Sequence, residues 1–138
     1  MSKNETIEVS AAVIVKDGNI LATQRGYGEF KGKWEFPGGK IKEDESKEDA
    51  LKREIKEETT ADINIIDYIN TVEYDYPTFH LIMHSYLCEL ASDLNFVYHD
   101  KHSLEHENMV WLDLNEIDNL DWLPADLLVI DKIKSLKL

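Results

Sequence analysis

The sequence predicts an α/β (α+β) fold in which a mixed β-sheet is sandwiched between helices. Short β-branched segments alternate along the chain with helical patterns, which is typical of helices that cover a sheet. No internal repeat or linker-like stretch interrupts this alternation. A length of 138 residues fits one hydrophobic core, so we expect a single domain over residues 1–138.

The N-terminal half is expected to begin with a β-hairpin. Residues 8–16 are rich enough in β-branched side chains for a buried strand, Asp17-Gly18 is a strong turn signal, and residues 19–25 form the returning strand. Residues 26–40 contain five of the six glycines and are expected to be largely loop. A helix should follow from about Ser46, as its N-cap, to Thr59.

The C-terminal half is expected to add three strands and two helices. The strands cover residues 63–74, 79–90 and 108–113, with a turn near Tyr76-Pro77 between the first two. Residues 113–120 suit a short helix. Pro124 suits the first position of a last helix, whose predicted apolar stripe consists of Leu127, Ile130, Ile133 and Leu136.

The charge balance restricts the partners. The formal net charge is −13, and such a field disfavours DNA, RNA and anionic membranes, so we expect neither nucleic acid nor membrane as a partner. A phosphate compound would bind only where a cation reverses the local sign. Cys88 is the single cysteine and the start of the chain has no apolar signal region, so the expected location is cytoplasmic.

The central helix carries an unusual acidic face. Glu54, Glu57 and Glu58 are three and four positions apart, so their carboxylates share one face and repel one another. A helical wheel places this face beside Leu51 and Ile55, at the edge of the core. Carboxylates there need compensating cations. Arg53 is placed to pair with Glu57, and bound divalent ions with oxygen ligands would compensate the rest.

These residues resemble the signature box of the Nudix hydrolases. The matching residues are Gly39, Glu45 and the run Arg53-Glu54-Ile55-Lys56-Glu57-Glu58. The resemblance implies the Nudix fold and cleavage of a diphosphate linkage in a nucleoside diphosphate attached to another group. The family usually has glycine where this chain has Thr60. Since that glycine ends the helix, threonine there costs about 1 kcal/mol or shifts the cap.

The resemblance extends to the MutT-type branch, which converts nucleoside triphosphates to monophosphates and pyrophosphate. The segment W-E-F-P-G-G-K at 34–40, which ends at Lys40, resembles that branch, as does L-P-A-D at 123–126. Arg25 matches a residue that the branch uses on its nucleotide. Glu105 matches the position of a further acidic ligand or base.

The resemblance implies the following site. Mg²⁺, with Mn²⁺ as an alternative ion, would be held by Gly38 through its carbonyl oxygen and by Glu54, Glu57, Glu58 and Glu105. Glu54 is the first choice as general base and Glu105 the second. Arg53 would orient the glutamates, while Arg25 and Lys40 would contact the substrate.

For the nucleobase, Phe36 and Tyr76 either flank its ring or simply pack in the core. Asp126 takes a position where the branch that removes oxidised guanine nucleotides typically has Asn. An ionised Asp only accepts hydrogen bonds, which suits the exocyclic amine of cytosine, although a negative charge also suits a helix N-terminus. The resemblance therefore favours (d)CTP or a modified cytosine nucleotide, with 8-oxo-dGTP as the alternative.

Two further alternatives remain from the sequence. A Nudix enzyme can act on a nucleotide sugar or ADP-ribose instead of a triphosphate. A non-catalytic Nudix domain can sense a nucleotide, but such domains usually lose glutamates of the box, and all four are present here. The preferred base and sugar, the number of metal ions and the oligomeric state remain open.

Overall fold

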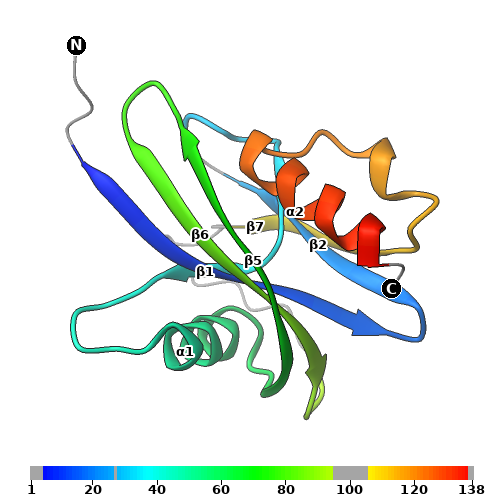
Figure 1. Ribbon diagram of the computed structural model, residues 1–138. Coiled ribbons are helices and arrows are strands. Elements are labelled where there is room, and N and C mark those ends of the chain that lie inside the picture. Colours follow the sequence, from blue (N-terminus) through cyan, green and yellow to red (C-terminus); the bar gives the residue numbers. More distant parts are fainter. Residues whose placement is uncertain (1–4, 27, 95–105, 137–138) are drawn as a thin grey trace.

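The computed structural model describes residues 5–26, 28–94 and 106–136, and its strands form a mixed seven-stranded sheet (Figure 1). The strands are β1 (Thr6–Lys16), β2 (Asn19–Arg25), β3 (Trp34–Glu35), β4 (Gly38–Lys40), β5 (Ile63–Asp75), β6 (His80–Leu90) and β7 (His106–Leu112). The helices are α1 (Lys47–Thr59), α2 (Pro124–Leu136) and the 3₁₀ helix η2 (Ile117–Asn119). The predicted fold class is confirmed.

Strand β1 connects the two parts of the sheet. It runs parallel to β6 and antiparallel to β4, while its last residues pair with β2. Strand β2 in turn pairs with β3 and β7, and β6 pairs with β5. The four-residue run Ala11–Ile14 is completely buried because both faces of β1 are covered at this point.

The two helices cover opposite faces of the sheet (Figure 1). Leu51 and Ile55 of α1 pack in the same buried cluster as Ala12 and Ile14 of β1. The other cluster contains the neighbouring β1 residues Ala11 and Val13 together with the buried residues Ala125, Val129, Ile130 and Ile133 of α2. Among the described residues, no helix is long and apolar enough to cross a membrane.

Helix α1 begins and ends where the sequence predicts. The Ser46 side chain accepts a hydrogen bond from the Asp49 backbone N–H at 3.0 Å, which confirms the predicted N-cap. Thr60 ends the helix with φ 60° and ψ 1°, in the left-handed region that the absent glycine would occupy at little cost. The helix therefore ends where the family pattern predicts, in spite of the threonine.

One expectation needs correction and one needs more detail. In α2 the stripe is wrong in part, because Leu127 and Leu136 are 44% and 45% exposed while Val129 is buried. Residues spaced by three drift by about 60° per step around a helix, so Leu127 and Leu136 lie on opposite sides of it. The glycine-rich segment is largely loop, as expected, but two short strands form within it, because β3 pairs with β2 and β4 pairs with β1.

Candidate active site

A cleft of about 810 Å³ brings together residues from both halves of the chain. It is lined by eight of the predicted site residues, namely Arg25, Phe36, Gly38, Lys40, Glu54, Glu58, Tyr76 and Asp126. Arg53 and Glu57 are not part of the lining. Glu105 lies outside the described residues. Ile7, Val9, Leu81 and Met83 on the parallel strands β1 and β6 add an apolar surface to the cleft.

The three glutamates of α1 differ in their surroundings. Glu58 is half-buried and Glu54 has a side chain only 17% exposed, and both line the cleft. The Glu57 side chain is 55% exposed. On a wheel of about 100° per residue, Glu58 lies about 40° from Glu54 toward the buried side, whereas Glu57 lies about 60° from it in the other direction. The shared acidic face is therefore split between cleft and surface.

Arg53 connects the acidic residues of the box. Its guanidinium donates to Glu45 (Nε to Oε2, 2.7 Å), Glu54 (Nη1 to Oε2, 2.9 Å) and Glu57 (Nη1 to Oε1, 3.2 Å). It also donates to the carbonyl oxygen of Lys40 at 3.0 Å, which ties α1 to β4. The hydrogen bond from Arg53 lowers the pKa of Glu45 to about 2. The predicted pairing of Arg53 with Glu57 is present, as part of this larger network.

The two glycines of β4 make room for close contacts. A Cβ atom on Gly39 would lie within 3 Å of the Glu54 carboxyl group, and one on Gly38 would overlap the carbonyl oxygen of Ser10 in β1. Ser10 in turn donates from Oγ to the carbonyl oxygen of Lys47 at 2.9 Å, at the start of α1. Glycine at these positions lets β1, β4 and α1 approach closely enough to place Glu54 against the β4 backbone.

The chemistry of these groups fits a hard divalent cation. Every side chain and carbonyl predicted as a ligand offers oxygen, the donor that Mg²⁺ and Mn²⁺ prefer. Glu54 lies directly against Gly39 and shares the cleft with Glu58 and Gly38. Within the described part of the chain, no three His, Cys, Asp or Glu side chains are arranged as a ready-made metal cluster. Ligation by all three glutamates therefore requires Glu57 to turn from Arg53 toward the cleft.

The lining of the cleft also includes aromatic residues and Asp126. Asp126 is 3% exposed and accepts a hydrogen bond from the Phe36 backbone N–H at 3.0 Å. The Ala125 N–H donates to the Tyr76 hydroxyl at 3.2 Å. Hydrogen bonds therefore connect the start of α2 to the β3–β4 connection, through Phe36, and to the β5–β6 turn, through Tyr76. Burial, with a further contribution from the Glu35 charge, raises the pKa of Asp126 well above its usual value.

The structure adds cleft residues that the sequence analysis did not select. Glu35 lies 3.1 Å from Arg25 Nε and helps to raise the pKa of Asp126. Lys42, Phe30 and Phe79 also line the cleft. The alternation of Lys40 and Lys42 in an extended segment was a usable signal for Lys42. Nothing in the sequence pattern distinguishes Phe30 or Phe79 from core aromatics.

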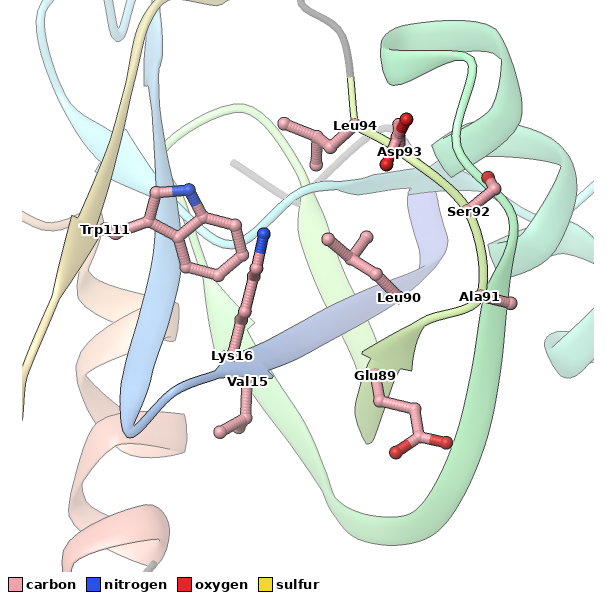
Figure 2. Close-up of a pocket in the computed structure, with 9 residues that line it drawn as sticks. All are labelled: Val15, Lys16, Glu89, Leu90, Ala91, Ser92, Asp93, Leu94 and Trp111. Carbon is pink, nitrogen blue, oxygen red and sulfur yellow. The ribbon is translucent and has the colours of Figure 1, made fainter.

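A second cavity, of about 660 Å³, lies away from these residues (Figure 2). Figure 2 shows Trp111 and Lys16 on one side of it and the segment from Leu90 to Leu94 on the other. It contains none of the predicted site residues. Cys88 is buried and does not line the cleft, and its burial raises the pKa of its thiol to about 12, so it is not a reactive thiolate.

Comparison with known proteins places this architecture in a family, because the NUDIX domain model matches residues 6–133. The chain belongs to the Nudix family. It is 30% identical to a CTP pyrophosphohydrolase of Escherichia coli K12 over 95% of this chain and 93% of that protein. It is 28% identical to the 8-oxo-dGTP diphosphatase of the same organism, over 94% of this chain and 98% of that one.

A solved structure supports the same fold. The MutT protein from Methanosarcina mazei Go1 superposes with a TM-score of 0.82 and 24% identity, covering 99% of this chain and 98% of that one. The chain is thus a Nudix pyrophosphohydrolase acting on nucleotides, in a family that typically depends on a divalent metal. The resemblance drawn from the box is confirmed, whereas the roles of individual site residues remain predictions.

Proposed function

We propose that this Nudix enzyme hydrolyses a nucleoside triphosphate to the monophosphate and pyrophosphate, with (d)CTP or a modified cytosine nucleotide as its preferred substrate. The observation that carries the proposal is that two chemically different sets of residues line one cleft. Glu54, Glu58 and Gly38 offer oxygen ligands in one set, and the other set consists of Asp126 and aromatic residues. A triphosphate and a nucleobase need these two environments.

At the phosphate end, Gly38, Glu54, Glu57 and Glu58 would hold the divalent cation. The cation supplies charge that neutralises phosphate oxygens and makes water easier to deprotonate. Lys40 and Lys42 add positive charge beside the same carboxylates, and in a chain with a net charge of −13 this lowers the electrostatic barrier to a polyphosphate.

A carboxylate must also take a proton from the attacking water. Glu54 is the proposed general base, because it lines the cleft and is held in place by Arg53 and by the close approach of Gly39. The oxygen of water then adds to the β-phosphorus, the bond from this phosphorus to the oxygen bridging to the α-phosphorus breaks, and the monophosphate leaves. Glu105 is the second candidate for the base.

At the base end, Asp126 is the group proposed to select cytosine. When neutral, its carboxyl group offers one donor and one acceptor, which complement N3 and the N4 amine of cytosine. When ionised, it still accepts from the N4 amine. The raised pKa extends the neutral form to higher pH. Similarity over 95% of this chain to a relative named CTP pyrophosphohydrolase supports the same choice.

A neutral Asp126 also favours the second candidate substrate, 8-oxo-dGTP. Oxidised guanine offers an N7–H donor beside the O6 acceptor, and a group that both donates and accepts pairs with these atoms. Similarity to an 8-oxo-dGTP diphosphatase over nearly the whole chain agrees with this alternative. Asp126 therefore fits both bases when neutral, and the cytosine choice rests on its ionised form, which only accepts, and on similarity to the CTP pyrophosphohydrolase, while the chemistry rests on the box.

Product analysis tests the proposal directly. The enzyme is incubated with Mg²⁺ or with EDTA and with CTP, dCTP, 5-methyl-dCTP, 8-oxo-dGTP, the other common triphosphates and ADP-ribose, and both monophosphate and pyrophosphate are quantified. We expect the highest kcat/KM for a cytosine nucleotide and no product with EDTA. Preference for 8-oxo-dGTP would overturn the base assignment. Activity confined to ADP-ribose would overturn the triphosphate proposal.

Hydrolysis in ¹⁸O-labelled water locates the attacked phosphorus. Attack at the β-phosphorus places the label in pyrophosphate, whereas attack at the α-phosphorus places it in the monophosphate. We expect label in pyrophosphate alone. Label in the monophosphate would contradict the proposed step without affecting the assignment of the substrate.

A further inference from the structure

We infer that the nucleobase stacks on Phe30 and Phe79, and that Phe36 and Tyr76 support the site without forming its contact surface. This inference rests on the proposed function and deepens it. All four aromatic residues line the cleft. Phe36 and Tyr76 are only 4% and 5% exposed, whereas Phe30 and Phe79 are half-buried and keep accessible ring surface.

Tyr76 is fully engaged within the protein. Its ring contacts Tyr74 (centroid distance 4.7 Å), Phe30 (5.1 Å) and Phe79 (5.1 Å). Its hydroxyl accepts a hydrogen bond from the Ala125 N–H, and burial raises its pKa to about 12. With its ring packed on three sides and its hydroxyl occupied, Tyr76 holds the two phenylalanines in position.

Phe36 has a comparable supporting position. Its ring lies 4.9 Å from the buried Trp122, and its backbone N–H donates to Asp126. It therefore fixes the carboxyl group proposed to recognise the base, and its own ring is covered by the core. Stacking on a base requires accessible ring surface, so we assign the contact with the base to the less buried rings of Phe30 and Phe79.

Phe30 and Phe79 reach the cleft from distant segments. Phe30 belongs to the connection between β2 and β3, and Phe79 lies at the β5–β6 turn, where its carbonyl oxygen accepts from the Tyr76 N–H at 2.9 Å. Both rings contact the Tyr76 ring and both line the cleft, and we call these two rings together the aromatic wall. Every base has a π-face, so this wall would bind bases with little discrimination, while Asp126 selects among them.

The test compares Phe79→Leu and Phe30→Leu with the control Tyr74→Leu. Tyr74 is half-buried and contacts the same Tyr76 ring but does not line the cleft. KM and kcat are measured with the preferred triphosphate, and the Kd of CMP and of inorganic pyrophosphate by calorimetry with Mg²⁺. Thermal melting checks that each variant is folded.

We expect both phenylalanine variants to raise KM and the Kd of CMP by about 5- to 150-fold, since base–aromatic stacking contributes about 1–3 kcal/mol. The Kd of pyrophosphate should not change, and Tyr74→Leu should alter neither. Unchanged CMP binding in both phenylalanine variants, or an equal loss in Tyr74→Leu, would overturn the inference. A wild type that turns over no triphosphate would instead overturn the proposed function, while its CMP affinity still decides on the aromatic wall.

Discussion

Replacing Thr60 with glycine should stabilise the protein, because the helix already ends in the conformation that glycine prefers. Thr60 has φ 60°, and a residue with a Cβ in this region costs about 1–2 kcal/mol. Glycine removes this cost, but it also increases the entropy of the unfolded chain, which lowers the free energy of unfolding by about 0.5–1 kcal/mol. The hydrogen bond from Thr60 Oγ1 to the Thr59 carbonyl oxygen is also lost, at an exposed residue where it contributes little.

The expected net gain is about 0.5–1 kcal/mol in the free energy of unfolding. A chain of 138 residues has an unfolding entropy of about 0.3 kcal/mol/K, so Tm should rise by about 2–3 °C. Calorimetry of the wild type, Thr60→Gly and the control Thr60→Ala measures this. Thr60→Ala keeps a Cβ in the left-handed region and should change Tm much less. A lower Tm for Thr60→Gly, or equal gains in both variants, would refute the reasoning.

Three further outcomes are expected. Glu58→Gln should lower kcat by at least about 100-fold and weaken Mg²⁺ binding, with the circular dichroism spectrum unchanged, because it removes a proposed ligand in the cleft. Gly39→Ala should lower both activity and the free energy of unfolding, the latter by about 1–3 kcal/mol, because its Cβ would overlap the Glu54 carboxyl group. Asp126→Asn should be more stable than the wild type at neutral pH, and denaturant unfolding should show this advantage shrinking as the pH falls toward 4.

The sign of the last outcome follows from linkage. The folded-state pKa of Asp126 is raised, so the folded wild type holds a proton that the unfolded chain releases, and its stability falls as pH rises from near 3.8 through the folded-state pKa. Asn has no such proton and keeps an oxygen for the Phe36 N–H. A stability difference between Asp126→Asn and the wild type that does not depend on pH would contradict the linkage argument. Full activity in Glu58→Gln would contradict its role as a ligand, and an unchanged Tm in Gly39→Ala would contradict the predicted overlap with Glu54.

The box was predictable from sequence because its spacing is local. The 3.6-residue period placed Glu54 and Glu58 beside Leu51 and Ile55, and the Ser46 cap set the start of the helix. The same period also places Glu57 on the side of Glu54 away from the core, but the hydrogen bond from Arg53 that holds the Glu57 carboxylate in an exposed position had to be read from the structure.

The base end was less predictable because its geometry depends on contacts between distant residues. The burial of Asp126 depends on Phe36, ninety residues away in sequence, and no local pattern encodes this. Phe36 and Tyr76 were predicted either to flank the base or to pack in the core. Their near-complete burial follows from packing against Trp122 and the β5–β6 turn.

Strand β1 also determines how the molecule can fluctuate. Its central residues belong to both hydrophobic clusters, and its Ser10 and Ala11 pair with the two glycines of β4. Detaching β1 would disrupt both hydrophobic clusters together, so the free energy needed to detach it should approach the free energy of global unfolding. The amide protons of Ala12 and Val13 would then be among the slowest to exchange with deuterium, and the backbone at the metal end of the cleft would be preformed, so that substrate or metal need reorient only side chains such as Glu57.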